Sequence, residues 1–292
     1  MLIAAAFGDV YALGWEFAWP PPRPRWRSGP SLLKPVYRDG VACYSDDTEM
    51  ALILARHLLR HGGVVQDAFA AELAEGARLG DSCRFYGSST SFVLHLVREG
   101  RDWRKASREA NSYGNGAAIR VPPVPMYYAD SEAVERAAKL QAEVTHSHRL
   151  GIEGAVIVAL AIEEAAAGTP LEEIPAELAK RGLAKVYQER LEAVSGLLDS
   201  SPFEVAAKLG TGAAAPESVP AALLCAARSG GSVMEAVTCA ICLGGDTDSI
   251  ASMAAAITAA GGRLDVPREL LEKIENYREI VEVSRRLVEN RG

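Results

Sequence analysis

The sequence has few basic residues and no long hydrophobic run. Its 31 Lys and Arg residues are outnumbered by 38 Asp and Glu residues, which gives a net charge of −7. An acidic chain does not attract phosphate groups, so we expect no general binding to nucleic acids or to anionic membranes. The longest hydrophobic run, residues 155–162, is too short to cross a bilayer. The apolar N-terminus lacks the basic residues that begin a signal peptide, so we expect a cytoplasmic protein.

Cysteine is scarce as well. The five cysteines are odd in number and fall mostly in helical patterns, which predicts reduced, buried thiols. Cys239 and Cys242 form a C-x-x-C motif inside an apolar stretch that has no second pair. Core packing is therefore expected at this motif, and zinc or redox chemistry is not.

Patterns typical of β-strands are also missing. We find no persuasive alternation of polar and apolar residues and no hairpin turn between alternating runs. Helix-capping signals begin instead at Thr169, Ser201 and Ser232. The sequence therefore predicts an all-α fold, with residues 1–292 forming one compact domain of about a dozen helices.

The sequence does contain two similar acidic segments, each leading into an apolar helix. Residues 243–252 read LGGDTDSIAS, and residues 44–50 read YSDDTEM. Taken singly, either segment is explained by helix capping, because an acid at a helix start binds free N–H groups. Taken together, the two segments predict one metal site. Carboxylate and hydroxyl oxygens are ligands that suit Mg²⁺ or Mn²⁺. Four carboxylates in one cleft would also repel one another if no cation were bound. If the segments do not meet, both are caps.

Other segments have features of a binding site. Residues 84–91, RFYGSSTS, place a glycine and hydroxyls at a helix start, where N–H groups can hold a phosphate; an ordinary cap is the alternative. Residues 111–123 contain two glycines around Asn115, and THSHR at 145–149 carries two histidines that suit hydrogen bonding better than metal coordination. The Pro-rich segment from residue 20 to residue 43 is interpreted as a lid, a binding loop or a solvated basic patch.

One further acid stands among large apolar residues. Glu16 lies between Trp15 and Phe17, in a stretch expected to be helical over residues 1–17. Apolar neighbours can tune the pKa of a carboxyl group, which makes Glu16 a candidate acid–base residue. A solvated acid at a helix end is the alternative.

In this order along the chain, these segments resemble the ADP-ribosylglycohydrolase family. The resemblance covers Gly8-Asp9 and Glu16, then SDDTEM, YGSSTS, SYGNGAAIR, THSHRLGIEGA and GGDTDSIAS. It implies an all-α, orthogonal multi-helix domain around a central cleft that holds two Mg²⁺ ions, with Mn²⁺ as the alternative ion. It also implies hydrolysis of the N- or O-glycosidic bond between ADP-ribose and an acceptor, such as a protein side chain.

The resemblance assigns roles to individual residues. Glu16 and Asp47 are the expected catalytic residues. The expected metal ligands are Ser45, Asp46, Asp47, Asp246, Asp248 and Ser249. The residues expected to bind the ADP-ribose portion of the substrate are Gly87, Ser88, Ser89, Ser112, Tyr113, Gly114, Asn115, Gly116 and His146.

Two other functions are compatible with these residues. One is a metal-dependent hydrolase of free nucleosides or of another ribosyl conjugate. The other is a non-catalytic ADP-ribose binder of the same fold, although the presence of all six metal-ligand positions favours an enzyme. The expected partner is ADP-ribose or an ADP-ribosylated protein, and a monomer is the favoured state.

Overall fold

The computed structural model describes residues 1–18, 26 and 29–292, and it confirms the predicted all-α fold. The α-helices run from α1 to α17, more than the expected dozen, because several are single turns. They are α1 (Leu2–Ala12), α2 (Asp46–His61), α3 (Gln66–Gly76), α4 (Ser88–Arg98), α5 (Trp103–Ala110), α6 (Gly116–Ile119), α7 (Pro123–Tyr127), α8 (Ser131–Glu143), α9 (Arg149–Ala166), α10 (Ile174–Ala179), α11 (Lys185–Leu197), α12 (Pro202–Leu209), α13 (Ala215–Arg228), α14 (Val233–Leu243), α15 (Thr247–Gly261), α16 (Arg268–Leu271) and α17 (Tyr277–Glu289).

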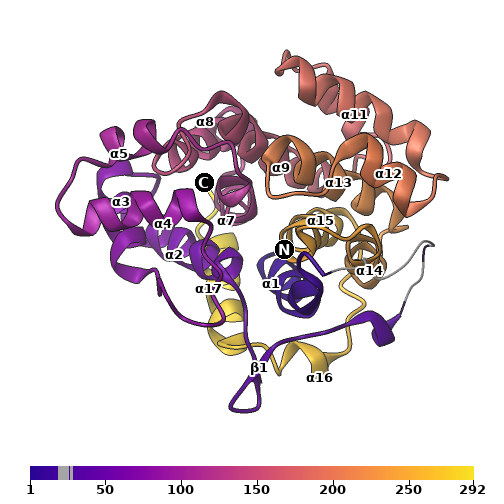
Figure 1. Cartoon of the computed structure of the whole chain (residues 1–292), viewed down its shortest axis with the longest axis horizontal. Helices are drawn as coiled ribbons and strands as arrows, with labels where there is room; N and C mark the ends of the chain where they lie inside the picture. The colour runs from indigo at the N-terminus through magenta and orange to yellow at the C-terminus, as the bar shows by residue number, and fades with distance from the viewer. Residues whose placement is uncertain (19–25, 27–28) are drawn as a thin grey trace.

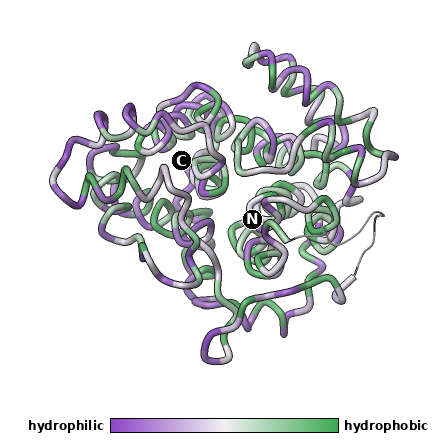
Figure 2. Tube along the Cα trace, in the orientation of Figure 1, coloured by the Kyte–Doolittle hydropathy of each residue, from purple (hydrophilic) through white to green (hydrophobic). Residues whose placement is uncertain are grey.

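The first helix packs in the core against helices from the later part of the chain. α1 packs along α15 and also contacts α14, although these helices are more than two hundred residues apart (Figure 1). Apolar residues run along these central helices, whereas the outer loops are more hydrophilic (Figure 2). A Cβ atom built on Gly8 of α1 would lie 2.4 Å from the carbonyl oxygen of Ala251 in α15. Only glycine therefore lets these two helices approach so closely.

Two groups of helices flank this centre. Helices α2 to α5 and α8 lie on one side, and α11, α12 and α13 lie on the other (Figure 1). α13 and α9 both pack against α15, and α17 packs against α2. Of the two acidic segments, the first begins α2 on one side, and the second begins α15 in the centre.

A short hairpin corrects the expectation that the chain contains none. Strands β1 (Tyr37–Arg38) and β2 (Val41–Ala42) pair antiparallel. They are joined by Asp39 and Gly40, which have φ angles of 52° and 80°. Asp-Gly is a preferred pair for such a two-residue turn. Each strand spans only two residues, too few to form an alternating pattern that would predict the hairpin.

The first helix ends earlier than predicted. α1 stops at Ala12, and a 3₁₀ turn, η1 (Leu13–Trp15), follows it. Glu16 therefore lies in the connection after this turn and not on a helix. The chain then passes to Phe17, whose N–H donates to the carbonyl oxygen of Gly245 at 2.7 Å. This contact brings the Glu16 segment to the start of α15.

Other sequence expectations can also be placed. The five cysteines are buried, as predicted. The first part of the Pro-rich segment, residues 20–25 with 27 and 28, lies outside the described residues, so its interpretation stays a prediction. Later in this segment a second 3₁₀ turn forms, η2 (Pro30–Leu32). In the part of the chain that is described, no helix is both long and apolar enough to span a membrane.

Candidate active site

Two acidic segments that are distant in the sequence meet at one cleft. Asp46 and Asp47 lie in the first turn of α2; Asp246 is the residue before α15, and Asp248 lies in the first turn of that helix. All four carboxylates line the same cavity, whose volume is about 270 Å³. The prediction that the two segments come together is confirmed.

Helix capping does not account for these acids. The hydroxyl of Ser45 caps α2 by accepting the N–H of Asp47 at 3.2 Å. Asp246 occupies the N-cap position of α15, yet among the described residues its side chain makes no capping hydrogen bond. Asp47 Oδ2 and Asp248 Oδ1 are buried without a hydrogen-bond partner in the described chain. Because unpaired buried carboxylate oxygens are costly unless something neutralises them, these residues fit a divalent cation.

Crowding also changes the protonation of these carboxyl groups. Burial, and then the neighbouring carboxylates, raise the pKa of Asp47 and of Asp248 well above the usual range. Burial raises the pKa of Glu16 to about 7, with further contributions from the charges of Asp246 and Asp9. Ligand oxygens of Glu16, Asp246 and Asp248 lie within 4.8 Å of one another. The group can therefore hold a cation or, without one, protons close to neutral pH.

The rest of the cleft wall comes from the segments expected to bind ADP-ribose. Of the predicted residues other than the acids, those that line it are Gly87, Ser88, Ser89, Ser112, Gly114, Asn115, Gly116, His146 and Ser249. Two predicted residues are not among the lining residues. Ser45 is buried beneath the start of α2, and Tyr113 is half-exposed, with its ring 5.4 Å from that of His148. The individual roles assigned to all of these residues stay predictions.

A buried acid on α1 holds the first acidic segment in place. Asp9 accepts the N–H of Ser45 at 3.0 Å, the N–H of Thr48 at 3.1 Å and the hydroxyl of Thr48 at 2.6 Å. Burial raises the pKa of Asp9 to about 6, and these hydrogen bonds oppose the rise. The resemblance to the family includes Asp9 but assigns it no role. An acid in an otherwise apolar helix was the available signal.

The start of α15 is held from several sides. Gly245 has a φ of 80°, and a Cβ atom built on it would lie 2.1 Å from the carbonyl oxygen of Thr211. The same carbonyl accepts the N–H of Asp246 at 2.8 Å. Asn115 donates from Nδ2 to Asp246 Oδ2 at 2.8 Å. Asn115 thus supports a predicted metal ligand directly, a role that sequence reasoning did not assign to it.

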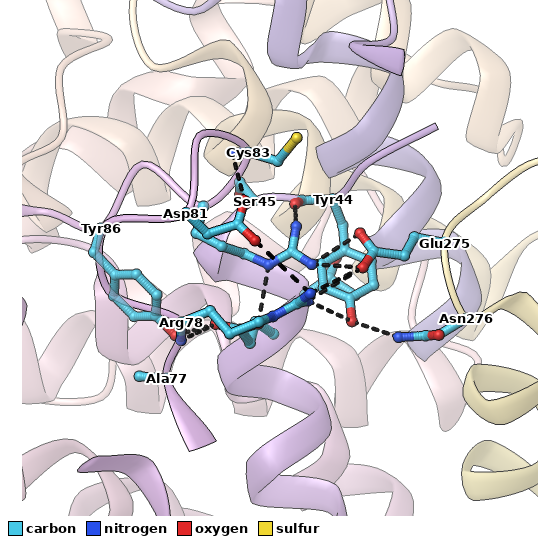
Figure 3. Close-up of polar contacts among 12 residues, drawn as sticks. Tyr44, Ser45, Ala77, Arg78, Asp81, Cys83, Tyr86, Glu275 and Asn276 are labelled. Carbon is cyan, nitrogen blue, oxygen red and sulfur yellow. Dashed lines mark hydrogen bonds and ion pairs between the residues drawn. The ribbon is translucent and has the colours of Figure 1, made fainter. Parts of the chain in front are cut away.

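A network of buried ion pairs lies behind the first acidic segment. Arg84 is fully buried and donates to Glu49 at 2.9 Å and to Glu275 at 2.7 Å. Its guanidinium also donates to the carbonyl oxygen of Tyr44, while its own carbonyl oxygen accepts the N–H of Asp46 at 2.8 Å. Figure 3 shows that Asn276, the next residue after Glu275, donates to the hydroxyl of Tyr44, at 2.9 Å. The network ties the backbone that leads into α2 to a segment more than two hundred residues away.

Two exposed phenylalanines at the cleft were not predicted. Phe17 is 58% exposed and Phe85 is 53% exposed, and both line the cavity. Their φ angles are 45° and 42°, in the left-handed region that non-glycine residues rarely adopt. Such strain costs about 1–2 kcal/mol at each residue. Strained, exposed aromatic residues beside an acidic site are candidates for contacts with a ligand.

Comparisons with known proteins agree with this geometry. Residues 1–292 match the family model described as ADP-ribosylglycohydrolase. ADP-ribosylhydrolase ARH3 from Bos taurus is 33% identical over 281 residues, covering 83% of this chain and 77% of that protein. The Homo sapiens ARH3 is 33% identical over 275 residues, covering 81% and 76%. A solved structure described as an ADP-ribosylglycohydrolase-related protein complex has a TM-score of 0.76 and 25% identity, covering 99% of this chain and 95% of that one.

An all-α fold with an acidic cleft at two helix starts defines a class of glycoside hydrolases, consistent with these matches. The chain belongs to the ADP-ribosylglycohydrolase family. It is a hydrolase that acts on ADP-ribosyl linkages.

Proposed function

We propose that this hydrolase uses Mg²⁺ to release ADP-ribose from a modified protein side chain. The observation that carries the proposal is the pair of buried carboxylate oxygens, one from each acidic segment, that have no partner in the described chain. Similarity to the ADP-ribosylhydrolases ARH3 supports the substrate class. Residues 1–292 act as one domain in this proposal, because the two acidic segments lie near opposite ends of the chain. We propose a monomer, since one chain supplies both segments.

The proposed metal centre uses the two acidic segments. Its ligands are Ser45, Asp46, Asp47, Asp246, Asp248 and Ser249. Divalent cations there would supply positive charge that binds and orients ribose hydroxyls and offsets the four carboxylates. Mn²⁺ has similar ligand preferences and is the alternative ion.

Carboxyl groups around the metal centre are proposed to transfer a proton and to stabilise the charge that develops during the reaction. Glu16 lies beside the proposed ligands Asp246 and Asp248 and is the candidate that delivers a proton to the leaving atom of the acceptor. Asp47 is the second candidate for this role. As the glycosidic bond breaks, positive charge develops on the ribose, and the surrounding carboxylates stabilise it. A water molecule then adds to C1 of the ribose and gives a proton to the carboxylate that protonated the leaving atom, which restores that acid.

The start of α4 is the proposed site for the diphosphate. Gly87 occupies the N-cap position, and because glycine has no side chain it leaves the start of the helix open to a ligand. Ser88 and Ser89 add hydroxyls beside the free N–H groups of this first turn. The loop from Ser112 to Gly116, together with His146, then binds the adenosine portion.

The test is release of ADP-ribose from peptides that carry it on serine, arginine or asparagine, with Mg²⁺ or with EDTA. We expect release only with the metal, loss of release in Asp248→Asn, and no cleavage of inosine. The relative rates identify the preferred acceptor. Release that is equally fast in EDTA would refute the metal dependence, and faster cleavage of inosine would refute the substrate class.

A further inference from the structure

A buried arginine without an acidic partner lies behind the cleft. Arg120 is fully buried. It donates to the side chain of Gln141 at 2.6 Å, to the backbone carbonyl of Gln141 at 2.6 Å and to the hydroxyl of Thr145 at 2.8 Å. Within the described residues, none of its hydrogen-bond partners is a carboxylate. Burying an unpaired charge is costly, and the pKa of Arg120 is lowered to about 9 by that burial. Such a costly group points to a role beyond packing.

The hydroxyl of Thr145 connects Arg120 to His146. Its oxygen accepts a hydrogen from Arg120 Nη1 and lies 2.8 Å from His146 Nδ1. Arginine is only a donor, so the hydroxyl keeps its own hydrogen for another acceptor. In the described structure that acceptor is His146 Nδ1. If Nδ1 carried a hydrogen instead, the hydroxyl would receive two donors and its own hydrogen would have no partner.

This arrangement determines which ring nitrogen of His146 carries the hydrogen. With Nδ1 as an acceptor, the hydrogen of the neutral ring lies on Nε2. Burial, and then the charge of Arg120, lower the pKa of His146 to about 3, so the ring is neutral at working pH. The ring lines the cleft next to the glycine loop, where a Cβ atom on Gly116 would lie 3.3 Å from Nε2 and one on Gly114 would lie 3.7 Å from it. The glycines therefore leave Nε2 close to the space for a ligand.

We infer that Arg120 and Thr145 are positioning residues: they hold His146 as the Nε2–H tautomer, so that it donates a hydrogen bond to an acceptor atom of the ADP-ribose portion. The inference rests on the proposed function, which places ADP-ribose in this cleft. Arg120 and Thr145 act through His146 and touch no substrate atom. Their effect is on binding, because the hydrogen bond falls on the part of the substrate that does not react.

The tautomer can be measured directly in the ligand-free protein. Two-bond ¹H–¹⁵N spectra of the histidine rings distinguish Nε2–H from Nδ1–H. We expect Nε2–H for His146 in the wild type and in Thr145→Ser, and a mixture of tautomers in Thr145→Val. Two other histidines are internal references: His148 Nδ1 accepts the N–H of Leu150, and His57 Nε2 accepts the N–H of Val65. His148 should therefore be the Nε2–H tautomer and His57 the Nδ1–H tautomer. Neither should respond to either substitution.

Affinity then tests the consequence for binding. Thr145→Val should raise the Kd for ADP-ribose and the KM by the factor by which the Nε2–H fraction of His146 falls, about twofold for an equal mixture, with kcat nearly unchanged. Thr145→Ser should leave both values at the wild-type level, because it keeps the hydroxyl. His146→Gln places an amide donor near the position of Nε2 and should remove most of the effect of Thr145→Val in the double variant.

The outcomes separate the two proposals. An Nδ1–H tautomer of His146 in the wild type overturns the positioning role, even if Thr145→Val does not fold. Unchanged affinity in a folded Thr145→Val variant also overturns the positioning role. In that case the proposed function still stands, because the wild type releases ADP-ribose. Wild-type protein that neither binds ADP-ribose nor releases it from any substrate overturns the proposed function, and the positioning role falls with it.

Discussion

Asn115 and Asp246 are joined by a hydrogen bond of 2.8 Å from the amide Nδ2 to the carboxylate Oδ2. Both side chains are buried, and the same amide nitrogen donates to the hydroxyl of Ser218 at 3.1 Å. Asn115 belongs to the loop before α6, whereas Asp246 precedes α15. The bond therefore links the loop expected to bind substrate to the acids expected to bind metal.

The first prediction concerns this link. Asn115→Ala should lower Mg²⁺ affinity and turnover by about 10- to 100-fold, because groups that orient metal ligands typically contribute this much. Isothermal titration with Mg²⁺ and the release assay measure the two effects. Asn290→Ala, at an exposed residue near the C-terminus, is the control and should change neither. Wild-type Mg²⁺ affinity in folded Asn115→Ala would show that Asp246 needs no such support.

The second prediction concerns the strained phenylalanine before the diphosphate segment. Phe85→Gly should keep or raise the melting temperature, because glycine adopts a φ of 42° without strain. The same change should raise KM severalfold if the ring contacts substrate. Phe203, which is 77% exposed on α12, provides the control Phe203→Ala, with KM unchanged. A lower melting temperature together with an unaltered KM would make Phe85 a structural residue only.

The third prediction links metal binding to pH. Burial and nearby charges raise the pKa values of Asp46, Asp47 and Asp248, and the pKa of Glu16 is about 7. A folded-state pKa above the unfolded value stabilises the metal-free protein at low pH, and this stabilisation is lost as pH rises through the folded-state pKa. A cation must displace the protons, so Mg²⁺ should stabilise the protein more at about pH 8 than at about pH 6.

Thermal unfolding with Mg²⁺ and with EDTA at both pH values measures this linkage. Titration in buffers of different ionisation enthalpy should show proton release on binding. Asp199→Asn, at an exposed acid, should leave the pH dependence unaltered. A Mg²⁺ effect that shrinks as pH rises would mean that the acids of the cleft are not the ligands.

The fourth prediction tests the close contact between α1 and α15. Gly8→Ala should destabilise the protein by about 1–3 kcal/mol or more, since the added methyl group meets backbone atoms that cannot rotate away. Gly196 on α11 has nothing within 4 Å of its added Cβ atom. Gly196→Ala is thus the matched control, and it should be neutral or stabilising by up to about 1 kcal/mol. Equal melting temperatures for the two variants would show that α1 and α15 can separate at little cost.

The sequence predicted those features that depend on short segments. The acids at 46–47 and 246–248 stood out because each pair precedes an apolar helix, and a shared cation was the physical reason to bring the pairs together. The all-α fold followed from helix caps and from the lack of alternating patterns. The order of the matching segments along the chain then identified the family.

Contacts between distant residues could not be predicted in the same way. Asp9 binds the backbone of Ser45, and Arg84 pairs with Glu275 across 191 positions, yet no local pattern identifies either partner. The strain at Phe85 is a property of the backbone and leaves no signal in the sequence. Arg120 resembled any surface arginine until the structure showed it to be fully buried.

The most direct test of the proposed metal centre is an anomalous difference map from a crystal of the protein soaked in Mn²⁺. We predict one or two peaks in the cleft, each about 2.0–2.3 Å from its carboxylate oxygens, with ligands from both the Asp46–Asp47 pair and the Asp246–Asp248 pair. A cleft without a peak, or an ion bound by only one of the two acidic segments, would contradict a shared metal centre.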